Sequence, residues 1–128
     1  MRKSITGAIA ASILSICVAT ALAQIAPAKS ADTSKGKALV DAKGLTLYTF
    51  DRDATGKSNC NGQCATNWPP LMAGVDAKAS GDWTIVTRDD GGKQWAYKGK
   101  PLYYWKDDKK AGDAEGDNRN NIWHVIAP

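Results

Sequence analysis

The sequence predicts a small, mostly β domain built from two tandem repeats of about 55 residues. Two observations carry this prediction: the chain aligns with itself in one register, and glycines punctuate short segments rich in aromatic and β-branched residues. A third observation, an N-terminal export signal, leaves roughly 90 residues for the fold, enough for one modest core. We expect antiparallel hairpins packed with pseudo-two-fold symmetry, and little helix apart from the signal peptide.

Residues 1–23 have the three parts of a cleaved secretory signal peptide. Arg2 and Lys3 form the positive start, an uncharged apolar run follows, and Ala21-Leu22-Ala23 gives the small-x-small cleavage site. The apolar run is about 15 residues long, whereas a membrane-spanning helix needs roughly 20. Ile16 stands before Cys17, where lipoprotein processing requires a small residue. The sequence therefore favours a periplasmic or secreted protein over a lipid-anchored one, with no transmembrane segment in the mature chain.

The rest of the chain divides by composition and by the repeat. Residues 24–35 are rich in Ala, Pro, Lys and Ser without apolar periodicity, and are interpreted as a flexible tether. Residues 36–128 form the repeat domain, with copy one at 36–73, a connecting segment and strand at 74–90, and copy two at 91–128.

The repeat rests on the kinds of residue that coincide when the chain is shifted by 55 positions. Seven identities fall in one gapless register, and most are Gly, Tyr, Trp or Asp, which seldom align by chance. The identical pairs are Gly36/Gly91, Lys43/Lys98, Gly44/Gly99, Leu47/Leu102, Tyr48/Tyr103, Asp53/Asp108 and Trp68/Trp123.

Each copy then has the same expected order of elements. A short strand leads through a Lys-Gly turn into a second strand, a polar loop follows, and a final short strand begins at a tryptophan. Pro69-Pro70 after Trp68 predicts an edge strand or extended coil there. The expected strands are Ala38–Asp41, Leu45–Phe50, Asp82–Arg88, Lys93–Tyr97 and Pro101–Trp105, with short strands starting at Trp68 and Trp123.

Charge and cysteine content limit the function classes. The formal charge of +4 falls to +2 when Arg2 and Lys3 leave with the signal, and no basic block remains, so nucleic acid is not an expected partner. Cys60 and Cys64 form an even pair in an oxidising compartment, which predicts a disulfide between them. A loop this short stabilises a local turn more than the whole fold.

All ten aromatic side chains lie in the repeat domain. The plainest interpretation is a core, because large rings bury the most area per residue in a small β domain. The alternative is a core with an aromatic binding surface on one side. The candidates for that surface are Trp83, Trp95, Tyr97 and Tyr104.

Metal binding and catalysis have little support in the sequence. Asp51 and Asp53 open a calcium-like loop, but Gly62 stands where an EF-hand has its twelfth-position glutamate. His124 is the only histidine, and no hydrolase, zinc-peptidase or phosphate-loop motif is present. We expect no enzyme, no catalytic residue and no cofactor, with Asp51, Asp53 and His124 as weak metal candidates.

The two copies carry a further shared pattern. Residues 48–53 and 103–108 both fit Y-x-[FWY]-x-x-D, and the first is followed by Cys60-x-x-x-Cys64-x-x-x-Trp68-Pro69-Pro70. In this combination, residues 36–128 closely resemble the bacterial secreted-repeat family, whose members are called predicted lipoproteins with the Y-x-[FWY]-x-x-D motif. The resemblance implies export, a tandem repeat and an unassigned biochemical role, and it carries over no catalytic residue.

The sequence thus predicts that the shared aromatic and aspartate positions hold the frame, with the aspartates capping their loops or accepting a hydrogen bond from a ring. These positions are Tyr48, Phe50, Asp53, Trp68, Tyr103, Trp105, Asp108 and Trp123. The leading functional hypothesis is a non-enzymatic binding or envelope-associated module for a ligand or envelope component that the sequence does not identify. The alternative is a metal or redox protein using Cys60, Cys64 and His124. A site is expected where the two copies differ.

Overall fold

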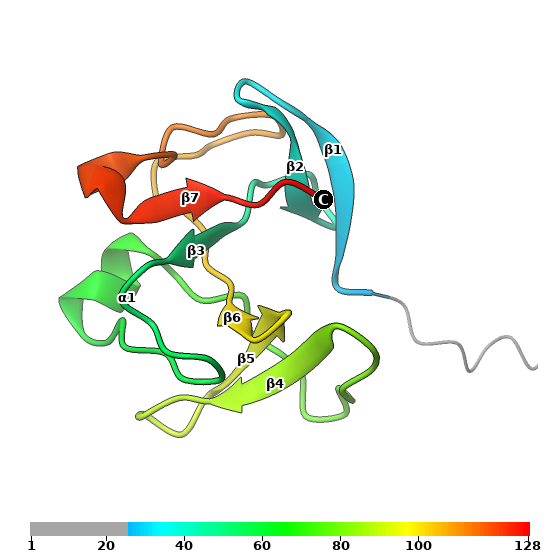
Figure 1. Cartoon of the computed structure of the whole chain (residues 1–128), viewed down its shortest axis with the longest axis vertical. Coiled ribbons are helices and arrows are strands. Elements are labelled where there is room, and N and C mark those ends of the chain that lie inside the picture. Colours follow the sequence, from blue (N-terminus) through cyan, green and yellow to red (C-terminus); the bar gives the residue numbers. More distant parts are fainter. Residues whose placement is uncertain (1–25) are drawn as a thin grey trace, which may run out of the picture.

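A computed structural model describes residues 26–128 of the chain (Figure 1). The predicted signal peptide, its cleavage site and Cys17 therefore lie outside the described residues.

Each copy begins with an antiparallel hairpin. The first consists of β1 (Ala28–Thr33) and β2 (Gly36–Asp41), and the second of β4 (Trp83–Thr87) and β5 (Lys93–Tyr97), which β6 (Lys100–Pro101) extends to a three-stranded sheet. Ala28 lies opposite Asp41 and Trp83 lies opposite Tyr97, so the second hairpin has one residue more between its paired ends. The two hairpins lie at opposite ends of the molecule, with β3 and β7 between them (Figure 1).

Strand β1 corrects the prediction that residues 24–35 are a tether. Its sequence AKSADT is mostly polar because β1 is an edge strand with three of its six residues exposed, and such a composition resembles that of a linker. The strand nevertheless pairs with β2 along its whole length, and Ala28 packs against the core. Copy one therefore starts with a strand that corresponds to β4 in copy two.

A central antiparallel ladder joins the two copies. β3 (Tyr48–Phe50) pairs with β7 (Trp123–Val125), with Tyr48 opposite Val125, while Tyr103 forms the matching bridge to Pro70. Between these pairs, the backbones of Tyr48 and Tyr103 exchange hydrogen bonds of 2.8 and 3.0 Å. Because Tyr48 and Tyr103 are equivalent residues of the two copies, a pseudo-two-fold axis passes between them.

Two short helices occupy corresponding positions of the copies, where the sequence predicted only polar loops. These are α1 (Gln63–Asn67) and the 3₁₀ helix η2 (Arg119–Asn121). Trp68 caps the end of α1 rather than beginning a regular strand, and only the isolated bridge at Pro70 continues the ladder. Among residues 26–128, no helix is both long and apolar enough to cross a membrane.

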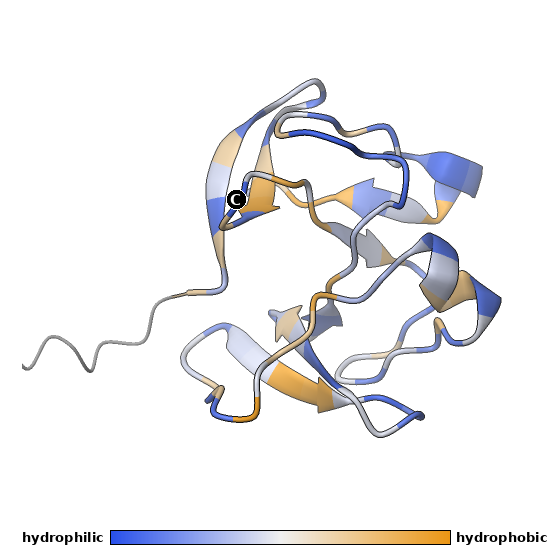
Figure 2. Ribbon diagram, turned by 180° about the vertical axis from the view of Figure 1, so that it is seen from behind, coloured by the Kyte–Doolittle hydropathy of each residue, from blue (hydrophilic) through white to orange (hydrophobic). Residues whose placement is uncertain are grey.

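The central ladder has a hydrophobic cluster on each face, because neighbouring residues of a strand point to opposite sides. We call one the aromatic cluster; its buried members are Tyr48, Cys60, Trp68, Tyr103, Trp105 and Trp123. The other, the leucine cluster, contains Leu47, Leu71 and Leu102, covered by half-buried side chains from both hairpins. Hydrophilic residues collect instead in η2 and in parts of the loop before it (Figure 2).

Candidate functional site

The tyrosine and aspartate of the shared six-residue motif bind each other across the copies. Tyr48 in copy one donates a hydrogen bond of 2.5 Å to Asp108 in copy two, and Tyr103 in copy two donates one of 2.7 Å to Asp53 in copy one. Each aspartate also accepts a backbone N–H from its own loop, Asn59 for Asp53 and Glu115 for Asp108. The aspartates therefore act both as loop caps and as acceptors from the tyrosines.

Burial changes the acidity of this cross-linked set. Desolvation, reinforced by the hydrogen bond to Asp108, raises the pKa of Tyr48 far above the usual tyrosine value, and desolvation likewise raises the pKa of Tyr103. Burial also raises the pKa of Asp53, although the Asn59 N–H and the Tyr103 hydroxyl act in the opposite direction. Both tyrosines are therefore held as hydrogen-bond donors.

The middle aromatic of the motif belongs to a column of rings that alternates between the copies. Phe50 stacks on Trp123 at 4.1 Å, Trp123 on Trp68 at 3.8 Å, and Trp68 meets Trp105 at 4.3 Å with the rings tilted by 39°. The Arg119 guanidinium lies 4.4 Å from the centre of the Trp105 ring and covers that end of the column. The column is therefore a structural core shared by both copies.

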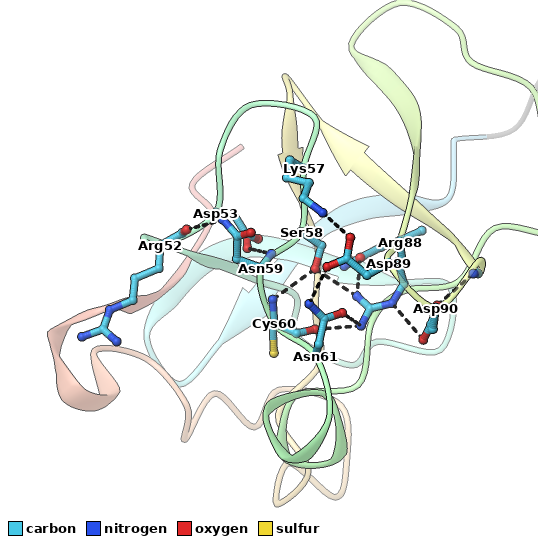
Figure 3. A network of polar contacts seen from close by, with 12 residues as sticks. Arg52, Asp53, Lys57, Ser58, Asn59, Cys60, Asn61, Arg88, Asp89 and Asp90 are labelled. Atoms are coloured by element: carbon cyan, nitrogen blue, oxygen red, sulfur yellow. Dashed lines mark hydrogen bonds and ion pairs between the residues drawn. The ribbon is translucent and has the colours of Figure 1, made fainter.

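A buried arginine connects the disulfide loop to the second hairpin (Figure 3). Arg88 is 3 % exposed, and its guanidinium donates to Ser58 at 3.0 Å, to Gln94 at 2.8 Å and to the Cys60 carbonyl at 2.7 Å. Ser58 in turn lies 2.6 Å from the Tyr103 hydroxyl. Arg88 and Ser58 do not stand out in the sequence, because nothing in the local pattern distinguishes a buried arginine next to a turn from an exposed one.

Cys60 and Cys64 form the predicted disulfide, with Cα atoms 5.2 Å apart. Both thiols are consumed by this bond, so the Cys60, Cys64 and His124 metal alternative gains no support. His124 instead lies with Nε2 2.8 Å from Asp51 and Nδ1 3.2 Å from Asn118. Within the part of the chain that the structure describes, no three His, Cys, Asp or Glu side chains gather as a metal site.

The four residues named as a candidate binding surface gather around the leucine cluster. Trp83, Trp95, Tyr97 and Tyr104 all pack against it and remain half-buried. Trp83 contacts Tyr97 with ring centres 4.8 Å apart, whereas the Tyr104 hydroxyl donates to Asp41 at 2.7 Å. Three of these rings belong to the second hairpin, and Tyr104 belongs to the central ladder.

A surface pocket of about 330 Å³ opens beside this set, between the C-terminal segment and the turn after β5. We call it the Thr49 pocket, after the β3 residue in it. Its lining is Thr49, Asp51, Tyr97, Lys98, Lys100, His124, Val125, Ile126 and Ala127. A second hollow of about 300 Å³ adjoins it and shares Thr49, Asp51 and Lys100.

The Thr49 pocket is lined mostly by residues that differ between the copies, with Lys98 as an exception. Tyr104 is the equivalent of Thr49, and its ring is packed on the leucine cluster and held by Asp41. Lys100 replaces Leu45 and His124 replaces Pro69. Asp51, Tyr97 and His124 of this lining were candidate site residues in the sequence, whereas Thr49 and Lys100 were not. The signal that would have found the pocket was the change from Tyr104 to Thr49 at one position of the repeat.

The family described as "Secreted repeat of unknown function" matches residues 29–72 and 84–127. These two ranges are 55 positions apart, in the register of the internal repeat, and each begins within or next to the first strand of a hairpin. No curated protein and no solved structure is significantly similar to the chain. Because the two matches cover most of the described residues, the chain belongs to this family of secreted repeats, whose biochemical role is unassigned.

Proposed function

We propose that the protein is an exported, non-enzymatic binding module, periplasmic or secreted, whose site is the Thr49 pocket. The observation that carries this proposal is the difference between the two halves. Pseudo-symmetry places the Tyr104 ring where Thr49 lies in the other copy, so a bulky side chain fills one half and a small one leaves the other open. A concave pocket that combines apolar walls with a few polar groups is the default location for a ligand site, and this difference between the copies supports placing it here.

The lining favours a small ligand with an apolar body and an acidic group. Tyr97, Val125 and Ile126 supply ring and aliphatic surface, and Lys98 and Lys100 add two positively charged side chains to the lining. The carboxylate of Asp51 is already engaged by His124 at 2.8 Å. The pocket therefore offers a net positive rim above an apolar wall, which suits a carboxylate or sulfonate carried by a ring or alkyl chain.

Binding fits the site better than catalysis. His124 with Asp51 forms an acid–base pair at the pocket, but Ser58 is fully buried and its hydroxyl is committed to Tyr103 and Arg88. A nucleophile within reach of His124 would be needed for covalent hydrolysis. The described lining contributes only Thr49 and Tyr97 hydroxyls and the two lysines.

The experiment titrates 8-anilinonaphthalene-1-sulfonate and laurate against the mature chain and the variant Thr49→Tyr. Filling the pocket with the residue of the other copy is expected to weaken binding at least tenfold while leaving the near-ultraviolet circular dichroism unchanged. Lys98→Gln is expected to weaken binding several-fold, and less so at high salt, because exposed charges are screened. The matched control is Lys43→Gln, the equivalent lysine of copy one, which leaves binding unchanged.

Two outcomes overturn the proposal. One is wild-type affinity in the folded Thr49→Tyr variant, which places the ligand elsewhere. The other is a wild-type chain that binds neither probe at millimolar concentration, since the pocket then lacks the expected affinity for acidic amphiphiles.

A further inference from the structure

We propose that the two copies are exchangeable halves, so that a second copy of this chain supplies copy two to copy one in a dimer with two complete lobes. This inference is independent of the proposed ligand. It rests on the reciprocity of the contacts between the copies and on the connector between them.

The contacts of the six-residue motif and of the ring column occur in pairs related by the pseudo-two-fold axis, whereas the Arg88 contacts with the disulfide loop and the Tyr104–Asp41 hydrogen bond occur once. The Tyr48–Asp108 hydrogen bond corresponds to Tyr103–Asp53, and the Phe50–Trp123 stack corresponds to Trp105–Trp68. In the backbone, Leu39 donates to Ile126 at 3.0 Å, and Trp95 donates to Leu71 at 2.8 Å. A contact set of this kind is what two protein chains form across a true two-fold axis.

Neither copy completes its own core. Copy one supplies Phe50 and Trp68 to the ring column but needs Trp105 and Trp123 of copy two between and beside them. The buried motif tyrosine of each copy has its aspartate partner in the other. A separated copy would therefore need the other copy, from the same chain or from a second chain, to complete its core.

The segment that connects the two copies is exposed and forms few backbone hydrogen bonds to the rest of the domain. Residues 74–82 are almost all exposed, Val75 by 97 %, and their backbone bonds are short-range turns, apart from the Asp82 carbonyl bound by Lys98. Exchange re-forms the same interface between chains and changes only the path of this connector. The balance between monomer and exchanged dimer is then set by connector length and protein concentration, as in other domain-swapped proteins.

In an exchanged dimer, the residues that line each Thr49 pocket come from two chains. Thr49 and Asp51 come from copy one, whereas Tyr97, Lys98 and His124 come from copy two. In the dimer each pocket is therefore completed by the partner chain.

The test removes Val75–Gly81 from the full mature chain. Ala73 bonds to Lys93 and Trp83 lies opposite Tyr97, four residues along β5, so the ends of the connector are at least about 13 Å apart. Gly74 and Asp82 alone reach at most about 11 Å. The shortened chain is expected to be a dimer by light scattering, with the near-ultraviolet circular dichroism of the stacked tryptophans. A control with the seven residues replaced by Gly and Ser at equal length stays monomeric.

A cysteine pair distinguishes exchange from any other dimer. Thr49 and His124 are paired residues of β3 and β7, from different copies. Thr49→Cys with His124→Cys is expected to give a covalent dimer on non-reducing gels in the shortened chain, and a covalently closed monomer in the control. A folded monomer, an unfolded monomer, or a dimer without the interchain bond in the shortened chain each overturns the proposal.

Discussion

Tyr48 and Tyr103 each reach across the pseudo-two-fold axis to the aspartate of the other copy. This geometry gives the six-residue motif a physical meaning: its first residue is a buried donor and its last is the acceptor for the equivalent donor. The intervening aromatic enters the ring column on the same face, because residues two apart in a strand point the same way. The six-residue motif thus joins the two copies through contacts between them.

The first prediction concerns the tyrosine hydroxyl. Tyr48→Phe leaves Asp108 Oδ2 without its tyrosine donor and the Gly116 N–H, 3.1 Å from that hydroxyl, without an acceptor. Leaving buried polar groups unpaired costs about 1–3 kcal/mol, so the free energy of unfolding in urea is expected to fall by that amount. Tyr103→Phe is expected to behave alike. Tyr97→Phe, half-buried and without a hydroxyl hydrogen bond among residues 26–128, serves as control; equal stability of Tyr48→Phe and this control contradicts the prediction.

The second prediction concerns alkaline pH. Burial, with the hydrogen bond to an aspartate, raises the pKa of Tyr48 and Tyr104 above the usual value of about 10, and burial also raises that of Tyr103. The unfolded chain then releases these protons at lower pH than the folded chain, so their contribution to stability is complete below pH 10 and declines as pH rises beyond it. Phenolate absorbance of these tyrosines is expected to appear together with the loss of near-ultraviolet circular dichroism. Phenolate formation by these tyrosines in a chain that stays folded contradicts this prediction.

At the scale of elements, the loop before η2 passes directly against the ring column. A Cβ added at Gly116 lies 2.8 and 2.9 Å from two carbons of the Trp68 ring and 3.0 Å from the Trp105 Cβ. Neither ring has room to move in a stacked column, so Gly116→Ala is expected to lower the free energy of unfolding by about 1–3 kcal/mol. Gly74→Ala, where no atom lies within 4 Å of the new Cβ, is the matched control. Equal urea midpoints for the two variants contradict the prediction.

The elements that the sequence predicted are those whose pattern is local. Lys93–Tyr97 matches β5, and Asp82–Arg88 contains β4, because both carry β-branched or aromatic residues bounded by turns. β1 was missed since an edge strand needs few apolar residues, and α1 was missed because its five residues show no helical period. β1 is held by backbone pairing with β2, and α1 carries Cys64 of the Cys60–Cys64 disulfide, so neither element needs a run of apolar side chains.

At the scale of the whole molecule, the self-alignment predicted the repeat and the pseudo-symmetry. It did not predict that the partners cross between copies, because a repeat whose tyrosine binds its own aspartate has the same sequence. The Thr49 pocket could not be predicted for the same reason. The difference between Thr49 and Tyr104 is visible in the sequence, but the pocket can be inferred from it only when both side chains are known to face the leucine cluster. Arg88 shows the same limit, since Ser58 and Cys60 lie in a single loop 30 and 28 residues before it in the chain.

The last prediction follows from the shared cores. Because both hydrophobic clusters contain residues of both copies, neither copy has a core that survives the loss of the other, and the domain is expected to unfold in one transition. Val40→Ala in β2 and Val86→Ala in β4 each remove a buried side chain from a hairpin of a different copy, at a cost of about 2 kcal/mol. Each variant is expected to shift the whole urea transition equally by tryptophan fluorescence and by far-ultraviolet circular dichroism. Two separate transitions, or a shift confined to one of the two signals, would show instead that the copies hold independent cores.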